Sequence, residues 1–182
     1  MNALVGNVFF DTCTLWNFAV VDRLDLLEIR YSWRARWTET VRFEIDEGYR
    51  CGEPRLRRVQ EASWLGDPVE VEGDRRALRE IDLIRQAMGG TSADPLKHLG
   101  EAEVIYHLQR REPSGIFITD DRPALDFALR RGIFALDTSQ VLAESFTQGE
   151  IGCPAAYDLI IEMAANERGV KVPTNHMAIC PT

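Results

Sequence analysis

The chain has 182 residues, of which 45% are hydrophobic and 27% are charged, and this length and composition suit one globular domain with a complete core. Its formal net charge of -8 and its pI near 5.0 exclude a protein that coats nucleic acid through bulk positive charge. No apolar run is long enough to span a bilayer, and the N-terminal apolar segment lacks the features of a signal peptide. We therefore expect a cytoplasmic protein with no membrane partner.

The cysteines, histidines and arginines give weaker signals. The four cysteines form no C-x-x-C pair, which argues against a zinc ribbon or a disulfide framework. The three histidines lack H-E-x-x-H spacing, so we do not expect a histidine to ligate metal. Most basic residues are arginines in short clusters, which suit either phosphate contacts or solvated helix faces. The clusters are Arg34 and Arg36; Arg55, Arg57 and Arg58; and Arg75, Arg76 and Arg79.

The first part of the chain predicts two strands and three helices. Residues 4–10 are rich in β-branched and aromatic side chains, which predicts a buried strand that ends directly before Asp11. Two helices follow, with apolar residues at helical spacing. Alternation of apolar residues with arginines over 33–37 predicts a short strand, and a helix that carries Glu44 comes after it.

The middle of the chain predicts two helices on either side of a short strand. Residues 54–65 form an amphipathic pattern that begins with a proline, as helices often do. A brief alternating strand over 69–71 precedes a helix over 74–88. We expect the apolar side of this helix to consist of Leu78, Ile81 and Ile84. The loop over 89–95 is rich in glycine and small polar residues.

The last part of the chain continues the alternation. A helix over 99–108 carries Glu101 in its first turn, and a strand over 115–119 ends on Asp120 and Asp121. A helix stopped by a glycine, a strand over 133–136, and two more helices complete the pattern; the last two helices lie over 139–146 and 155–167. Strands that alternate with helices predict an α/β fold with a mainly parallel sheet covered on both faces. Functional sites in such sheets lie beyond the carboxyl ends of the strands.

Acidic residues follow or flank the predicted strands. They are Asp11, Glu44, Glu101 with Glu103, and Asp120 with Asp121. Because the carboxyl ends of parallel strands meet at one edge, these carboxylates are expected to converge there, and crowded anions repel. A hard divalent cation relieves this repulsion, and carboxylates with water are the ligands that Mg²⁺ and Mn²⁺ prefer. The sequence therefore favours a metal-dependent hydrolase.

Each acid also has an ordinary explanation. Asp11 and the Asp120–Asp121 pair are suited to begin the helices that follow them. Glu101 is favoured in a first helical turn by the helix dipole, and Glu44 and Glu103 are compatible with solvated helix faces. The joint pattern is therefore stronger evidence than any single member.

Four segments carry a resemblance to a known family. They are Val8-Phe9-Phe10-Asp11-Thr12; Thr38 through Glu44; Leu99-Gly100-Glu101-Ala102-Glu103; and Ile116-Phe117-Ile118-Thr119-Asp120-Asp121. In this order the chain resembles the PIN-domain nucleases, and in particular the branch with a Gly-Glu-Ala-Glu stretch at the third motif. The resemblance covers essentially the whole chain.

The resemblance implies a three-layer α/β/α fold with a central, mainly parallel five-stranded sheet. Residues 1–150 are expected to form the nuclease domain, and residues 151–182 a C-terminal helix and tail packed on the same domain. The implied activity is that of a Mg²⁺- or Mn²⁺-dependent endoribonuclease that hydrolyses RNA phosphodiester bonds. Many relatives are toxins held inactive by a cognate antitoxin, so RNA and such an antitoxin are the partners that the resemblance implies.

The resemblance also implies roles for individual residues. The acidic positions of the family match Asp11, Glu44, Glu101 and one of Asp120 and Asp121, and all of these except Glu44 match metal ligands. Glu44 would orient a water or accept a proton, while the ion lowers the pKa of water and neutralises phosphate charge. The family's Thr-x-Asp spacing selects Asp121, whereas proximity to the strand end favours Asp120.

Further residues of these motifs have supporting roles by the same resemblance. Thr12 and Thr119 match positions where a hydroxyl or backbone group steadies the carboxylates. A glutamate stands where the family more often has an aspartate, and Glu101 and Glu103 both remain candidates for the direct ligand.

Two alternative functions remain at this stage. A catalytically silent protein of the same fold would bind RNA or a partner without cleaving it, although it would have no electrostatic reason to keep crowded acids. A haloacid-dehalogenase-like phosphatase also has an aspartate after its first strand, but its motif needs a second acid where Cys13 stands. A homodimer is a further expectation. Its surface would draw on Trp16, Phe18, Trp64 and Leu65, for which core burial is the competing explanation.

Overall fold

The computed structural model describes residues 6–71 and 73–181, and four strands within them form one parallel sheet. The strands are β1 (Val8–Phe10), β2 (Ala35–Arg36), β3 (Ile116–Ile118) and β4 (Phe134–Leu136). Their order across the sheet is β2-β1-β3-β4. The chain therefore progresses outward in opposite directions from the β1–β3 pair, which makes this pair the point where a parallel sheet opens a crevice for a ligand. The first two residues of the strand predicted over 4–10 lie outside the described residues.

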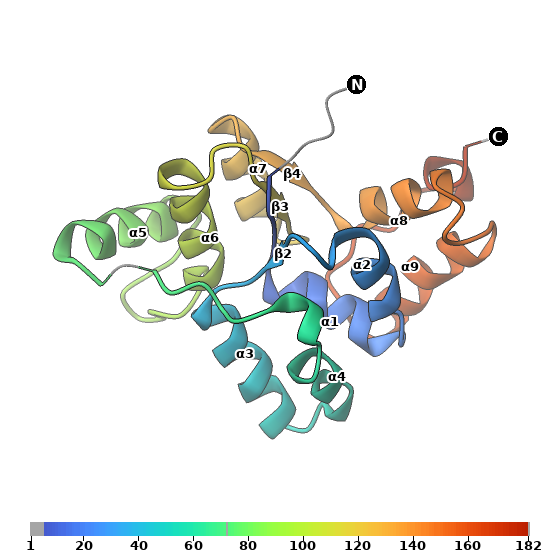
Figure 1. Ribbon diagram of the computed structural model, residues 1–182, viewed down its shortest axis with the longest axis horizontal. Coiled ribbons are helices and arrows are strands. Elements are labelled where there is room, and N and C mark those ends of the chain that lie inside the picture. The colour runs from blue at the N-terminus through green and yellow to red at the C-terminus, as the bar shows by residue number, and fades with distance from the viewer. Residues whose placement is uncertain (1–5, 72, 182) are drawn as a thin grey trace.

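Helices connect the strands, as the alternating sequence pattern predicted (Figure 1). They are α1 (Thr12–Val20), α2 (Leu24–Tyr31), α3 (Glu39–Arg50), α4 (Arg57–Gln60), α5 (Arg75–Ala87), α6 (Leu99–Arg110), α7 (Arg122–Arg130), α8 (Thr138–Thr147) and α9 (Ala155–Ala165). Short 3₁₀ turns are present at η1 (Pro54–Leu56), η2 (Ser63–Leu65) and η3 (His176–Ala178). The prediction of an α/β fold with a parallel sheet is confirmed.

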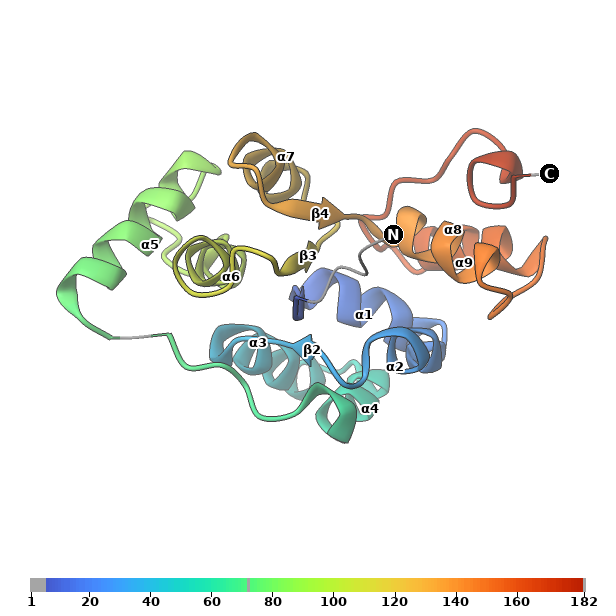
Figure 2. The same cartoon turned by 45° about the horizontal axis from the view of Figure 1, so that its top comes forward.

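The sheet has an apolar core on each face because successive strand residues point to opposite sides. Phe10 and Ile118 belong to a core with residues of α1, α2, α3, α8 and α9. Phe9 and Phe117 belong to a second core with residues of α5, α6 and α7. Figure 2 shows these two groups of helices on opposite sides of the strands. Helices therefore cover both faces, and the carboxyl edge of the sheet lies between the two helical layers.

The described sheet has four strands, so the expectation of five is not met. The segment predicted as a strand over 69–71 makes only an isolated bridge between Thr38 and Val69, supported by a hydrogen bond of 2.8 Å from Val69 N to Trp37 O. The chain leaves β2 after two residues to begin α3 at the cap Thr38, so there is no edge long enough for a further strand to extend along.

Two helix predictions also need correction. The helix predicted over 54–65 is divided: the 3₁₀ turn η1 runs directly into α4, and the non-helical backbone of Ala62 (φ -75°, ψ 85°) separates α4 from η2. In α5, Ile81 and Ile84 are buried as expected, but Leu78 is 56% exposed. The row that faces α6 begins at Ala77, and Leu78 lies one position outside it.

The segment after residue 150 shares the core of the first face. Ile160 and Met163 of α9 are fully buried in it, and α9 packs against both α8 and α1. Phe18 and Leu65 are fully buried as well, which confirms core burial over a dimer surface for these two residues. All four cysteines are free. Within the described ranges, no helix combines the length and apolarity needed to cross a bilayer.

Candidate metal centre

Asp11 lies at the carboxyl end of β1, where the sheet opens. It caps α1, because its Oδ1 accepts a hydrogen bond of 2.7 Å from Thr14 N. Its Oδ2 accepts a hydrogen bond from the Thr119 hydroxyl at the end of β3, and its own N–H donates to Ile118 O at 3.2 Å. The side chain is only 1% exposed. Asp11 therefore has the helix-cap role considered from the sequence, and it also joins the ends of the two central strands.

Glu44 and Glu101 approach this edge from two helices that contact each other, α3 and α6. Gly100 lies at this contact: a Cβ here would be 3.3 Å from Val41 Cγ2, which would have to shift by a few tenths of an ångström, and in ordinary contact with Glu44 Oε2 at 3.7 Å. The Thr12 hydroxyl donates a hydrogen bond to Glu44 Oε2 and so ties α3 to the start of α1. The glycine of the Gly-Glu-Ala-Glu stretch thus lies where the two glutamate-bearing helices pack against each other.

The electrostatics show that these acids are crowded. Burial, followed by the charge of Asp120, raises the pKa of Asp11 to about 7. Burial raises the pKa of Glu101 to about 8, and the charges of Asp11, Glu44 and Asp121 act in the same direction. Burial and the charge of Glu103 raise the pKa of Glu44. Without a cation, the site therefore keeps protons on buried carboxyl groups near neutral pH.

His98 completes a group of side chains that sequence reasoning did not include. His98, Glu101 and Asp121 each offer a ligand atom, and these atoms all lie within 4.8 Å of one another. His98 Nδ1 is 3.3 Å from Asp121 Oδ2, and the histidine side chain is 9% exposed. His98 caps α6 in a left-handed conformation with φ 60°. The expectation that no histidine would ligate metal is therefore not supported by the position of His98.

The structure gives different environments to the two neighbouring aspartates. Asp120 accepts hydrogen bonds from Asn17 Nδ2 at 2.6 Å, from Thr138 N at 3.0 Å, and from the Thr138 hydroxyl. Asp121 uses Oδ1 to cap α7 through Ala124 N at 2.8 Å, while its Oδ2 lies beside His98. The geometry therefore favours Asp121 as the ligand and gives Asp120 a role in holding the surrounding segments.

The remaining predicted residues lie around this group. The Thr119 hydroxyl donates to Asp11 and accepts a hydrogen bond of 3.1 Å from Asp121 N, so it fixes both acids. Glu103 accepts a hydrogen bond of 2.8 Å from Thr40 Oγ1 of α3, and burial raises its pKa. Glu103 links α6 to α3 and is not a member of the group with His98.

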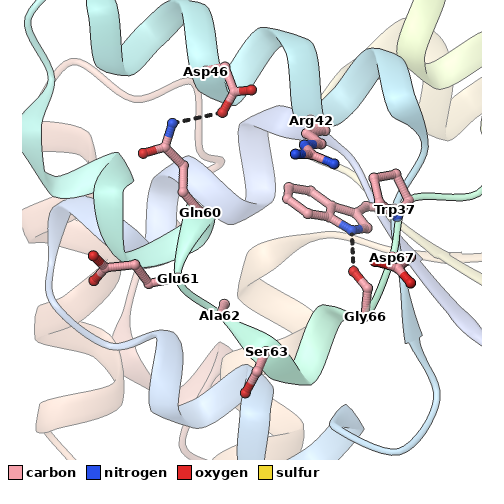
Figure 3. A pocket seen from close by; sticks show the side chains of 10 residues that line it. Trp37, Arg42, Asp46, Gln60, Glu61, Ala62, Ser63, Gly66 and Asp67 are labelled. Carbon is pink, nitrogen blue, oxygen red and sulfur yellow. Dashed lines mark hydrogen bonds between the residues drawn. The ribbon is translucent and has the colours of Figure 1, made fainter.

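A cleft of about 660 Å³ lies elsewhere, between α3, α4 and the segment through Gly66 (Figure 3). Asp46 accepts a hydrogen bond of 2.7 Å from Gln60 across it, and Trp37 Nε1 donates to Gly66 O at 3.0 Å. None of the acids at the sheet edge lines this cleft. Its charged lining is mainly acidic, with Arg42 as the one basic side chain among the lining residues, so it is not suited to phosphate.

The fold and these side chains define a parallel α/β protein with a candidate centre for a divalent cation at the carboxyl edge of its sheet. No family model matches the chain, and neither a curated protein nor a solved structure matches it. The function must therefore be argued from the residues themselves.

The raised pKa values predict how pH will affect stability. Asp11 and Glu101 titrate near 3.8 and 4.5 when unfolded but at about 7 and about 8 when folded. The folded chain therefore holds more protons between these limits, so its metal-free stability falls as pH rises through this window. Mn²⁺ must displace the same protons, and its dissociation constant should fall roughly tenfold per pH unit for each proton released.

Thermal melts at about pH 6 and about pH 8, with and without Mn²⁺, measure this linkage. We expect a lower metal-free midpoint at the higher pH and a larger rise on adding Mn²⁺ there. Glu101→Gln removes one of the two titrating groups and should weaken the pH dependence. A rise in midpoint that is independent of pH would contradict protonated carboxyl groups in the metal-free site.

Proposed function

We propose that the chain is a metal-dependent endoribonuclease of the PIN type, with its metal centre at Glu101, Asp121 and His98. One observation carries the proposal: a nitrogen and two carboxylate donors lie within 4.8 Å of one another at the point where the sheet opens. Asp11 and Glu44 lie close enough to Glu101 for their charges to raise its pKa. The order of the four motifs along the chain supports the nuclease class.

The donor set fits a divalent cation. Two carboxylates and one imidazole supply three ligand atoms, and the repulsion recorded in the raised pKa values is the repulsion that a cation relieves. Such an ion, when bound, lowers the pKa of water and neutralises charge that develops on a phosphate. The chain's own contribution is to fix the ligands: Thr119 orients Asp11, and the cap of α7 orients Asp121.

Glu44 is the proposed proton acceptor. In hydrolysis, a water oxygen bonds to phosphorus while the bond from phosphorus to the leaving ribose oxygen breaks. The water loses a proton, and the leaving oxygen gains one. Burial raises the pKa of Glu44 toward the range in which a carboxylate accepts a proton effectively, and the Thr12 hydroxyl holds its position.

Hydrolysis by water is favoured over attack by an aspartate. Both oxygens of Asp11 accept hydrogen bonds, and the side chain is almost fully buried, which is unsuited to a nucleophile that must reach phosphorus. Cys13 stands where a phosphatase of the haloacid-dehalogenase type needs its second acid. The nuclease is therefore preferred to the phosphatase.

The imidazole of His98 supports a choice between the two proposed metals. Imidazole favours transition-metal ions over Mg²⁺, so Mn²⁺ is the proposed cofactor. We expect calorimetric titration to give tighter binding of Mn²⁺ than of Mg²⁺, and His98→Gln to weaken Mn²⁺ binding at least about tenfold with little change for Mg²⁺. His176→Gln replaces an exposed histidine of η3 and should change neither affinity. Equal losses for the two ions would argue against His98 as a ligand.

Cleavage of a labelled single-stranded RNA tests the function directly. The parent protein should cleave this RNA in the presence of Mn²⁺, and cleavage should stop when a chelator is added. Mn²⁺ binding without cleavage would favour the silent member of the same fold, which binds RNA or a partner. Absence of both at millimolar Mn²⁺ would refute the proposed metal centre.

A further inference from the structure

Arg168 lies just after α9, and its backbone is held in a defined turn. Glu167 adopts a left-handed conformation with φ 58°, Glu167 N donates to Ala164 O at 3.0 Å, and Arg168 N donates to Met163 O at 3.2 Å. These two hydrogen bonds form the Schellman arrangement that ends many helices. The turn therefore fixes the backbone of Arg168 relative to α9.

The side chain of Arg168 is held against α1. Its Nε donates a hydrogen bond of 3.0 Å to Asn17 Oδ1, and its guanidinium carbon lies 4.4 Å from the centroid of the Trp16 ring. Asn17 in turn donates to Asp120 Oδ2 at 2.6 Å. Stacking on an indole fixes the plane of a guanidinium group, so Arg168 is oriented before any ligand arrives.

The two terminal amino groups of Arg168 remain available. Among the described residues, none accepts a hydrogen bond from Nη1 or Nη2, and none forms an ion pair with Arg168. Burial lowers the pKa of Arg168, and the nearby charges of Asp11 and Asp120 act in the opposite direction. A side chain that served only to neutralise these acids would be expected to pair with one of them directly. Arg168 instead binds the neutral amide of Asn17.

Three arginines of the clusters noted in the sequence differ from Arg168 because they form ion pairs with glutamates. Arg55 directs Nε and Nη2 to Glu53 and Nη1 to Val20 O and Asn166 Oδ1. Arg57 pairs with Glu61, and Arg76 pairs with Glu80. The donors of Arg55 are thus occupied, and the charges of Arg57 and Arg76 are each compensated by a glutamate that accepts from Nε. Arg168 forms no ion pair among the described residues, so it is the better candidate of these four for a phosphate contact.

We propose that Arg168, stacked on Trp16, binds a backbone phosphate of the RNA strand next to the one that is cleaved. This inference rests on the proposed nuclease function and names a substrate-binding residue for it. Its planar fork of two free amino groups matches two phosphate oxygens. Its position beside Asp11 and Asp120 supplies positive charge where a polyanion must approach an acidic site.

The test compares Arg168→Ala and Arg168→Lys with the parent and with Arg131→Ala. Arg131 is a matched control because its guanidinium also lies over an aromatic ring, 5.0 Å from the centroid of Phe127, but at the opposite end of α7 from Asp121. Cleavage of a labelled single-stranded RNA in Mn²⁺ gives kcat and KM at several salt concentrations. Fluorescence anisotropy of the same RNA, Mn²⁺ calorimetry and thermal melts complete the comparison.

For Arg168→Ala we expect KM to rise roughly tenfold or more with a much smaller change in kcat. The slope of log affinity against log salt should become shallower by about 0.7, the value for one phosphate contact on a single strand. Mn²⁺ affinity should stay the same or increase, because a nearby positive charge is removed. Arg131→Ala should match the parent in every measurement.

Three results would overturn the proposal: an unchanged KM and salt slope, a change that Arg131→Ala reproduces, or a rise in KM that accompanies weaker Mn²⁺ binding and a lower melting midpoint. If Arg168→Ala does not fold, Arg168→Lys decides. It keeps the charge but loses the fork, so KM should still rise while the salt slope is retained. If the parent binds RNA without cleaving it, the nuclease proposal fails, and the salt slope of binding alone tests Arg168.

Discussion

Asp11→Asn is expected to reduce Mn²⁺-dependent RNA cleavage at least about a hundredfold while leaving the fold intact. Asparagine caps helices as well as aspartate does, so the hydrogen bond from Thr14 N to the side chain should survive. The amide can still meet the Thr119 hydroxyl. What is lost is one negative charge beside Glu101, and with it much of the attraction for a divalent cation.

The same substitution should raise the melting midpoint of the metal-free protein near pH 8. Burial and the charge of Asp120 raise the pKa of Asp11 to about 7, so ionising it above that pH costs stability. An activity loss that occurs together with a stability gain separates a functional role from damage to the fold. Initial cleavage rates and thermal melts, each with and without Mn²⁺, provide the two measurements.

Asp74→Asn is the matched control for this experiment. Asp74 caps α5 by accepting hydrogen bonds from Arg76 N and Ala77 N, and it is exposed and remote from the sheet edge. The substitution removes one carboxylate from a helix cap, as Asp11→Asn does, but should leave cleavage unchanged. Equal cleavage by Asp11→Asn and the parent would refute a role for Asp11 at the site.

The sequence predicted those parts of the site that depend on strand ends. Asp11 and the Asp120–Asp121 pair follow apolar segments with a strong strand signal, and parallel strands bring such residues to one edge. Glu101 was predictable from the same argument, because its helix leads into β3. These three predictions need only the local strand and helix patterns and the rule that the carboxyl ends of parallel strands meet at one edge of the sheet.

His98 was not predictable by the same reasoning. The sequence has no pair of histidines spaced to lie on one helical face. His98 instead stands alone at the N-cap of α6, one turn before Glu101. The spacing of His98 and Glu101, three residues apart where a helix begins, was the available signal. The left-handed backbone of His98 is a conformation that non-glycine residues adopt uncommonly and that no sequence pattern indicated.

The choice between Asp120 and Asp121 likewise depends on contacts that only the folded structure shows. Both residues follow β3, and the two local features conflict: the Thr-x-Asp spacing selects Asp121, whereas proximity to the strand end favours Asp120. Their difference comes from Asn17 and Thr138, which are distant in sequence and supply the donors around Asp120. The environment of Arg168 has the same origin, since Trp16 and Asn17 lie about 150 residues before it along the chain.

Substituting these two aspartates should therefore give opposite results. Asp121→Asn keeps a good cap for α7 but loses the charged oxygen beside His98, so cleavage should fall about a hundredfold or more with little change in melting midpoint. Asp120→Asn should lower the melting midpoint and reduce Mn²⁺ binding far less. The first measurement is the cleavage rate at saturating Mn²⁺, and the second is a thermal melt without metal.

The reason for the instability lies in the donors around Asp120. Its oxygens accept from Asn17 Nδ2 and from both the N–H and the hydroxyl of Thr138. An asparagine must direct its own amino group at one of these donors. Asn17 cannot simply turn over to accept, because its Oδ1 already binds Arg168. A buried donor without an acceptor costs roughly 1–3 kcal/mol, which corresponds to several degrees in midpoint for a chain of this size.

A crossed outcome decides between the two aspartates. In the crossed outcome, Asp120→Asn melts normally but no longer binds Mn²⁺, and Asp121→Asn still cleaves RNA. Asp120, the residue nearer the strand end, would then be the ligand, and His98 would have no part in the metal centre. If the results follow the hydrogen bonds, the residue with an oxygen left unused by the protein is the ligand. Asp120, whose oxygens accept three internal hydrogen bonds, then stabilises the fold, because binding a cation would compete with those donors.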